Sequence, residues 1–294
     1  MRVALDAMGG DHAPAATVGG AVQAHAAGVE VVLVGQPARL SALLDQVGAR
    51  EEIAVVAATE VVGMDEEPAL ALRTKRDASI RVAAQLVASG EADALVSAGS
   101  TGATLAAALL VLGRVPGVRR PVLGAVIPTR RGGRVVLVDA GGSAEAQPEA
   151  LVGYAEIGLA YAGVLGACAP RVGLLNVGCE PRKGNALAKA AHELLQPFPG
   201  FTGNVEPDGV LDGSVDVVVT DGFTGNIFLK AVEAASGGYG DNAAVVLGVA
   251  GEVLVTHGAA TAHVVAEAVR MAAEAAAAGL SGKVAARLQR QGAR

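Results

Sequence analysis

The sequence predicts a doubly wound α/β fold with a mostly parallel sheet. Short runs rich in Val, Leu and Ile recur along the 294 residues, and Ala/Leu-rich stretches of helical pattern lie between them. The apolar runs do not alternate with polar residues, which is typical of central strands covered by helices on both faces. Hydrophobic residues make up 52% of the chain and aromatic residues only 2%, so the core must be aliphatic. The alternation of strands with helices favours the doubly wound arrangement.

Seven apolar runs are expected to form strands. They are Arg2–Met8, Val29–Gly35, Ala92–Gly99, Pro121–Ile127, Gly133–Gly141, Arg171–Gly178 and Val215–Gly222. The helices are expected at Ala15–Ala27, Ala78–Ser89, Ala103–Gly113 (a buried helix), Glu149–Leu165, Asn185–Leu195, Ile227–Ala235 and Thr261–Ala278. A chain of this length could form one large domain or two small ones. Because no long linker or repeat interrupts the pattern, we predict one α/β domain over residues 1–294, with a weak seam at Ser236–Asp241.

Composition excludes several classes of protein. A net charge of −6 and the scarcity of aromatic residues argue against a general nucleic-acid binder. The two cysteines, Cys168 and Cys179, form neither a metal-spaced cluster nor a disulfide framework, which favours a reducing, cytosolic setting. The first residues lack the pattern of a signal peptide, and no apolar run reaches the roughly 18 residues of a membrane span.

Glycines and small polar residues follow five of the expected strands. The five junctions contain Asp6, Gly9, Gly10 and Asp11; Ser97, Gly99, Ser100, Thr101 and Gly102; Asp139, Gly141, Gly142 and Ser143; Asn176, Gly178, Lys183 and Gly184; and Asp221, Gly222, Gly225 and Asn226. Each junction alone would be read as an ordinary turn. Ligands of open parallel sheets bind beyond the carboxyl ends of the strands. The five junctions together therefore predict a small-molecule cleft at that edge.

The residue types at these junctions suit an anionic ligand. Glycine lets the backbone approach a ligand closely, and helix N-termini offer free N–H groups to anions. Ser100 or Thr101 could cap the following helix, with or without a ligand beside it. Lys183, Asn226 and His257 are the candidate cation, amide and histidine, although a solvated lysine and a structural asparagine cap remain open as alternatives.

Familiar nucleotide and nucleophile motifs are missing. No P-loop pattern occurs, no strand leads into G-x-G-x-x-G, and no G-x-S-x-G is present. Cys179 lies near Lys183 in the sequence, but a nucleophilic role for this thiol is not favoured. The predicted site therefore binds and orients two reactants electrostatically.

Positive charge is segregated along the chain. Between Asp93 and Asp139 there is no acidic residue, but there are six arginines: Arg114, Arg119, Arg120, Arg130, Arg131 and Arg134. Such a region could dock an anionic partner, or it could be a set of solvated loop arginines.

Five stretches together resemble a known family. They are "LDAMGGDHAP", "SAGSTGA", "LLNVGCEPRKGN", "GNVEPDGVLDGSVDVVVTDGFTGNIFLK" and "LGVAGEVLVTHG", and they occur in the family's order from the first residues to about Gly258. The chain is identified by these motifs as a member of the phosphate acyltransferase family of bacterial phospholipid synthesis, the PlsX family.

The resemblance implies a fold and a reaction. The fold would be a three-layer α/β/α sandwich related to isopropylmalate dehydrogenases and phosphate acetyltransferases. Inorganic phosphate would attack the thioester of a long-chain acyl group on acyl carrier protein, giving acyl phosphate for phosphatidic acid synthesis. A downstream acyl-phosphate:glycerol-3-phosphate acyltransferase would use the product. The enzyme would be a cytoplasmic homodimer with possible peripheral membrane contact, needing no nucleotide or metal cofactor.

The resemblance also implies roles for individual residues. The expected catalytic residues are Lys183 beside phosphate or the leaving thiolate, Asn226 beside the oxyanion or phosphate, His257 as phosphate orienter or proton donor, and Asp221 as holder of its loop or of the lysine. The expected phosphate- or substrate-binding residues are Asp6, Gly9, Gly10, Asp11, Gly99, Ser100, Thr101, Gly102, Gly222 and Gly225. Acyl carrier protein is acidic, so Arg119 and Arg120 are expected to dock it.

The chain departs from the family pattern at a few places. Asn is expected where Ser100 stands, Asn and Asp where Ser143 and Glu145 stand, and Cys179 is unusual before Lys183. A longer helical segment is expected where only a short link, residues 236–244, is present. Three alternatives remain: an acyltransferase that uses CoA, a decarboxylating dehydrogenase of the same architecture, and a carrier-binding protein without turnover.

Overall fold

The computed structural model describes residues 1–235 and 243–292, which form two compact units. The first unit comprises residues 1–114 and 243–279, and the second comprises residues 115–235 and 280–292. The expected seam at Ser236–Asp241 lies outside the described residues, as does most of the short link. The single domain over residues 1–294 stays a prediction.

The first unit is built on a mostly parallel sheet. Its strands are β1 (Arg2–Asp6), β2 (Glu30–Gly35), β3 (Ala54–Ala57), β4 (Ala94–Ser97), β10 (Ala244–Leu247) and β11 (Glu252–Val255). They run side by side in the order β3-β2-β1-β4-β11-β10, and only the pair β10–β11 is antiparallel. Asp6 and Ser97 pair in register, so the ends of β1 and β4 meet at one edge. This register brings two of the predicted junctions together.

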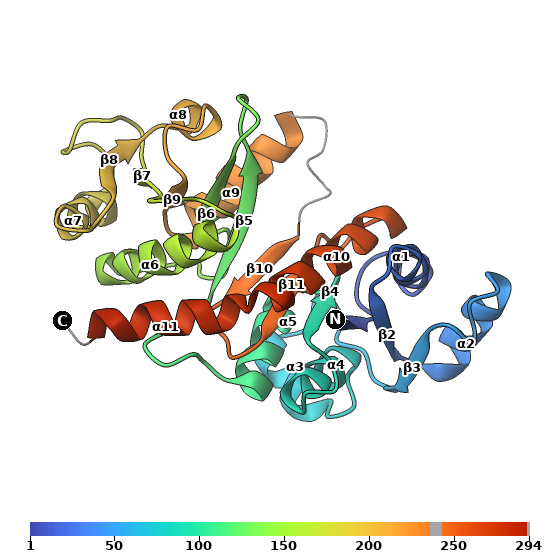
Figure 1. Ribbon diagram of the computed structural model, residues 1–294. Helices are drawn as coiled ribbons and strands as arrows, with labels where there is room; N and C mark the ends of the chain where they lie inside the picture. The colour runs from blue at the N-terminus through green and yellow to red at the C-terminus, as the bar shows by residue number, and fades with distance from the viewer. Residues whose placement is uncertain (236–242, 293–294) are drawn as a thin grey trace. The chain divides into compact units, whose positions relative to one another are not determined.

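Helices cover the strands of the first unit. They are α1 (Ala15–Ala26), α2 (Pro37–Gln46), α3 (Pro68–Thr74), α4 (Ser79–Ala88), α5 (Thr101–Ala107), the π-helix η1 (Ala108–Leu112) and α10 (Ala262–Ala278). The helices α1 and α10 lie side by side (Figure 1). Gly20 permits this contact, because a Cβ at that position would lie 2.6 Å from the side chain of Val265.

The second unit is also built on a mostly parallel sheet, with five strands. Its strands are β5 (Val122–Pro128), β6 (Arg134–Val138), β7 (Val172–Leu175), β8 (Phe201–Val205) and β9 (Val217–Val219), in the order β5-β6-β9-β7-β8. Only β5–β6 is antiparallel. The parallel strands β6, β9 and β7 place their carboxyl ends at one edge, followed by Asp139, Thr220 and Asn176.

The helices of the second unit are α6 (Pro148–Val164), α7 (Ala186–Leu195), α8 (Pro207–Leu211), α9 (Gly222–Ala235) and α11 (Leu280–Gly292). The apolar α6 packs on β6 and β9 and is itself flanked by α7 and α11 (Figure 1). Glu156 of α6 is 2% exposed and accepts a hydrogen bond from the Arg287 guanidinium of α11. Pairing of this buried carboxylate ties the last helix to the core, because an unpaired buried charge is strongly destabilising.

The predicted elements are confirmed in outline. All seven expected strands form. Five of them end before their apolar run does, because the last residues turn into the loops, whereas β2 and β5 each start one residue later than expected. The helix expected from Ile227 begins earlier, at Gly222. The prediction of one buried helix over Ala103–Gly113 is wrong in part, because α5 gives way to η1, where Leu109 and Leu110 are 38% and 52% exposed.

Candidate functional site

A buried carboxylate organises the strand ends of the first unit. Asp6 is 3% exposed, and its two oxygens accept hydrogen bonds from the Ser97 hydroxyl at 2.8 Å and from the Met8 N–H at 3.3 Å. Ser97 in turn accepts a hydrogen bond from the Gly99 N–H. A Cβ at Gly9 would lie 2.6 Å from an Asp6 oxygen and 2.8 Å from the Gly99 nitrogen. The two loops after β1 and β4 therefore touch through glycine.

The same loops reach the segment that carries His257. The Asp11 N–H donates to the Gly258 carbonyl at 2.7 Å, and a Cβ at Gly10 would lie 3.1 Å from that oxygen. The exposed His257 accepts a hydrogen bond from the Ala259 N–H at Nδ1, so a neutral ring carries its proton on Nε2. The predicted residues Asp6, Gly9, Gly10, Asp11, Gly99 and His257 thus belong to one cluster of loops.

The rest of the predicted glycine loop forms the start of α5. Ser100 is the N-cap, and its hydroxyl accepts from the Ala103 N–H at 3.5 Å. Thr101 is exposed, and Gly102 lies against the ring of Pro68. The enclosed space beside these residues measures about 10 Å³, which has room for at most about one water. Any larger anion must therefore bind outside it.

Replacing Asp6 with Asn should change how stability depends on pH. Burial raises the pKa of Asp6 above 3.8, although hydrogen bonds from Ser79, Ser97 and the backbone oppose this shift. The folded state therefore holds the proton more tightly than the unfolded state. The resulting stabilisation is complete below pH 3.8 and is lost as the pH rises through the folded-state pKa.

Urea unfolding from about pH 4 to about pH 8 measures this effect. The wild type should lose stability relative to Asp6→Asn as the pH rises, and the difference should then level off. A difference that stayed constant over this range would contradict the assignment.

A second buried carboxylate organises the strand ends of the second unit. Asp139 is fully buried, and its Oδ1 accepts from the N–H groups of Leu123, Gly141 and Gly142 at 2.7–3.0 Å. Its Oδ2 accepts from the Ser143 hydroxyl at 2.8 Å. Because four donors point at one carboxylate, the loop after β6 is held in a single shape and its glycine N–H groups are already used.

The first turn of α9 packs directly on this loop. A Cβ at Gly225 would overlap the carbonyl oxygen of Asp139, and a Cβ at Gly222 would overlap that of Ser143. Asn226 lies beside them, since a Cβ at Gly141 would be 3.3–3.4 Å from its side-chain atoms. The amide of Asn226 is therefore placed against the end of β6. The sequence placed Asp139 and Ser143 at a predicted junction but assigned neither a role, because nothing local marks a carboxylate as buried.

The two units use the same arrangement. In each, a strand ends in a buried aspartate, a Gly-Gly turn follows, and a serine hydroxyl donates to the carboxylate: Ser97 to Asp6 and Ser143 to Asp139. In each, a glycine from another junction packs on the turn. The departure from the family pattern at Ser143 thus falls on a buried structural partner.

The Lys183 loop closes on Asn176. The Asn176 amide donates to the Lys183 carbonyl at 3.1 Å, and its oxygen accepts from the Val177 N–H at 2.8 Å. The Lys183 side chain is 54% exposed and lies 4.0 Å from Glu180, its ion-pair partner. Asp221 accepts from both the N–H and the hydroxyl of Thr224, so it fixes the start of α9.

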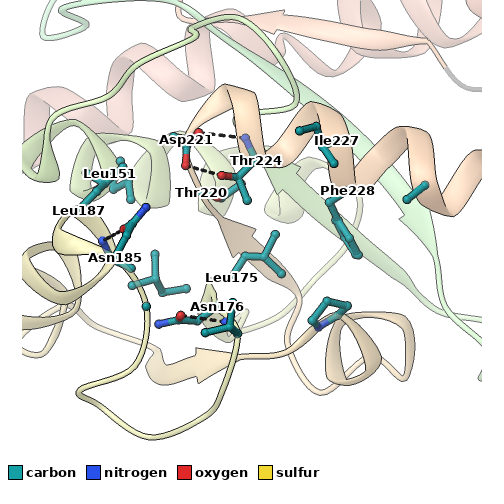
Figure 2. Close-up of a pocket in the computed structure, with 16 residues that line it drawn as sticks. Leu151, Leu175, Asn176, Asn185, Leu187, Thr220, Asp221, Thr224, Ile227 and Phe228 are labelled. Carbon is teal, nitrogen blue, oxygen red and sulfur yellow. Dashed lines mark hydrogen bonds between the residues drawn. The ribbon is translucent and has the colours of Figure 1, made fainter.

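An apolar pocket of about 460 Å³ opens between these loops (Figure 2). Leu151, Leu175 and Phe228 form buried walls, and Asp221 lies at a polar end. Figure 2 shows Ile227 and Phe228 of α9 on one side and Leu151 and Leu187 on the other. The sequence did not predict this pocket, because its walls come from segments far apart in the chain.

The predicted docking arginines lie together at a second cavity. Arg119 and Arg120 are exposed and line a space of about 220 Å³ that Tyr154 and Leu288 also border. Arg130 differs, because Asp208 and Asp212 lie 2.7 and 2.9 Å from its guanidinium. Part of the positive charge that is segregated in the sequence is therefore neutralised by carboxylates from another segment of the chain. Two other features are absent from the described residues: a group of side chains able to hold a metal ion, and a helix long and apolar enough to cross a membrane.

Comparison with solved structures establishes the class of fold. A phosphotransacetylase from Streptococcus pyogenes matches with a TM-score of 0.68 over 93% of this chain and 94% of its own, at 17% identity. At that identity the likeness concerns the fold alone. The chain thus has the α/β/α fold of phosphotransacetylases, as predicted.

Comparison of sequences establishes the family. A family model described as "Fatty acid synthesis protein" matches residues 1–240. A phosphate acyltransferase from Desulfitobacterium hafniense (strain Y51) is 52% identical over 241 residues, covering 81% of this chain and 72% of that protein. A phosphate acyltransferase from Nostoc sp. (strain PCC 7120) is 44% identical over 315 positions, which cover 94% of this chain and 92% of that protein. The chain belongs to the phosphate acyltransferase family, as its motifs predicted.

The longer alignment also reveals a difference in length. Its 315 positions exceed the 294 residues of the chain, so the Nostoc relative has residues without a counterpart here. The match of the family model includes Lys183, Asp221 and Asn226 and ends before His257.

Proposed function

We propose that this chain transfers a long-chain fatty acyl group from acyl carrier protein to inorganic phosphate, giving acyl phosphate. The observation that carries the proposal is the 52% identity to a phosphate acyltransferase, which extends over 81% of the chain. The site offers matching chemistry: glycine-rich strand ends, one amide held against a rigid loop, and a lysine on a neighbouring loop.

The reaction needs positioning more than activation. An oxygen of hydrogen phosphate attacks the thioester carbonyl carbon and forms the new C–O bond, and the C–S bond then breaks. The proton of the phosphate passes to the leaving thiolate, so the products are acyl phosphate and the free carrier thiol. Holding phosphate in line with the carbonyl replaces a bimolecular encounter with an oriented one. Donors aimed at the oxyanion stabilise the tetrahedral intermediate.

The residues divide these tasks. Asn226 would donate its amide to the oxyanion or to phosphate, because the loop held by Asp139 fixes its place. Lys183 would neutralise phosphate or the departing thiolate, which its partly exposed side chain permits. Asp221 would hold the start of α9 through Thr224. Gly222 and Gly225 would allow that helix to approach the loop.

Roles are also proposed for residues of the first unit. His257 would orient phosphate or donate a proton from Nε2, since its Nδ1 is occupied. Gly99, Ser100, Thr101 and Gly102 would face an anion from outside the closed space at Asp6. Gly9, Gly10 and Asp11 would hold the His257 loop.

The direct test is incubation with palmitoyl-acyl carrier protein and labelled phosphate, followed by trapping with hydroxylamine. The proposal predicts a hydroxamate that appears only when both substrates are present. Palmitoyl-CoA added as a competitor separates the two donors, because a CoA enzyme would use it in preference. Carrier binding without any hydroxamate would identify a non-catalytic homologue instead.

Reversing charge at Arg119 and Arg120 should weaken use of the carrier substrate. Steering by opposite charge is strongest at low salt, so Arg119→Glu with Arg120→Glu should raise KM for acyl carrier protein roughly tenfold there. KM for phosphate should stay unchanged. Arg134→Glu is the control, since Arg134 is exposed and lies away from that cavity. If KM for acyl carrier protein in the double variant depended on salt as it does in the wild type, the proposal that Arg119 and Arg120 dock the carrier would be wrong.

The remaining proposals concern setting and assembly. We place the enzyme in the cytoplasm as a homodimer that touches the membrane only peripherally. It would need no nucleotide, metal or nucleic acid. An acyl-phosphate:glycerol-3-phosphate acyltransferase would consume its product. Sedimentation of the purified chain, with and without lipid vesicles, tests the dimer and the membrane contact together.

A further inference from the structure

We propose that the pocket between α6, α7 and α9 holds the hydrocarbon chain of the acyl substrate and sets its preferred length. This inference rests on the proposed function and names the binding site for one part of its substrate. The pocket lies wholly within the second unit, so its shape depends on the fold of that unit alone.

Several polar groups around the pocket already have hydrogen-bond partners within the protein. Asn176 binds the backbone of its own loop, Asn185 accepts from the Ala188 N–H at 2.9 Å, and Asp221 accepts twice from Thr224. Most of the lining is aliphatic and aromatic surface. Such a lining selects an apolar ligand, because a polar one would lose its hydrogen bonds to water without replacement.

Exposed apolar side chains mark the mouth. Val177 and Ile227 line the pocket and are 81% and 54% exposed, whereas Leu151 and Phe228 deeper inside are 1% and 9% exposed. Large apolar side chains left in water around a cavity are typical of a binding site for an apolar partner. A hydrocarbon chain entering the pocket would cover both.

The size of the pocket fits a long chain. A methylene group takes about the volume of a water in the liquid, ~30 Å³. The cavity of about 460 Å³ therefore has room for roughly fifteen such groups. A fatty acyl chain is thus a closer fit than a short acyl group, which would leave most of the cavity empty.

The pocket runs along one face of α9. Thr224, Ile227, Phe228 and Ala231 share one face of α9, at the spacing of successive helical turns. Asn226 lies toward the opposite face, beside Gly141. Asp221 at the start of the same helix forms the polar end of the pocket. The thioester would lie at this helix start while the hydrocarbon extends along the helix.

The test narrows the pocket by a substitution and measures how kcat/KM depends on the length of the acyl chain. Ala188 of α7 lines the pocket and is half-buried, so Ala188→Leu adds about three carbon atoms to the wall. Each methylene displaced should cost about fourfold in affinity. We expect kcat/KM for palmitoyl-acyl carrier protein to fall tenfold or more, while kcat/KM for the octanoyl substrate changes less than twofold. The control is Ala190→Leu, also half-buried on α7 but outside the lining.

A binding readout keeps the test independent of turnover. The chain has no tryptophan, so Ile227→Trp places a single indole at the mouth. Palmitate should shift its emission to shorter wavelength, and Ala188→Leu in the same background should weaken that response tenfold or more. No response to palmitate, or equal chain-length profiles for Ala188→Leu and Ala190→Leu, would overturn the inference. Failure of the wild type to form acyl phosphate would overturn the proposed function, whereas the tryptophan response would still report on the pocket.

Discussion

Gly225→Ala should lower the free energy of unfolding of this protein far more than alanine at Gly153, Asn226 or Lys183. A methyl group at Gly225 would occupy the position of the Asp139 carbonyl oxygen, which is backbone and cannot rotate away. The loop around that carbonyl is fixed by four hydrogen bonds to the Asp139 carboxylate. We expect a loss of about 3 kcal/mol or more in the free energy of unfolding, because α9 must move away from the loop. Thermal unfolding would then occur roughly 6–10 °C lower.

Gly153→Ala provides the matched control for this substitution. Gly153 also lies within a helix, α6, but a Cβ there would meet no atom within 4 Å. Alanine favours a helix over glycine by up to about 1 kcal/mol, so this variant should be as stable as the wild type or slightly more stable. Equal melting temperatures for the two variants would show that α9 does not need the close approach.

Asn226→Ala should slow acyl phosphate formation without unfolding the protein. Removal of a single oxyanion donor lowers kcat roughly 100- to 1,000-fold. Asn226 lies against the Gly141 loop, and an alanine there removes only the amide proposed as the oxyanion donor. We expect kcat to fall by that factor, with circular dichroism and the melting temperature close to those of the wild type.

Two further variants complete the comparison. Lys230→Ala changes an exposed residue on the same helix and should leave kcat unchanged. Lys183→Ala should also lower kcat, because it removes the cation proposed beside phosphate or the thiolate. If Asn226→Ala and Lys183→Ala both kept near-normal rates, the assignment of roles in the second unit would be wrong.

The central strands could be predicted from the sequence because they are continuous apolar runs. The strands that were missed carry weaker signals. The strand β8 contains Thr202, Gly203 and Asn204, and β3 is only four residues long at the end of its sheet. The strands β10 and β11 follow one another without a helix between them, so they interrupt the alternation of strands and helices.

The sequence predicted which loops carry the candidate site residues, but it did not predict the contacts that those residues make. Glycine and aspartate after apolar runs indicated the junctions that meet within each unit, since strand ends in a parallel sheet share an edge. The sequence could not show that Asp139 is buried and bonded to Ser143, or that Arg130 is paired with Asp208. Arg130 and Asp208 are distant along the chain, and the burial of Asp139 depends on other segments, such as Leu123, that pack around it. The apolar pocket was missed for the same reason.

Isotopic labelling of phosphate identifies the nucleophile of the proposed reaction. The central claim is that inorganic phosphate itself attacks the thioester and that the new bond joins a phosphate oxygen to the acyl carbon. The enzyme would be incubated with palmitoyl-acyl carrier protein and phosphate labelled with ¹⁸O at every oxygen, and the product examined by mass spectrometry. We expect palmitoyl phosphate that retains all four labelled oxygens of the phosphate, including the one that bridges phosphorus and the acyl carbon. Release of free palmitate without labelled palmitoyl phosphate would contradict this claim.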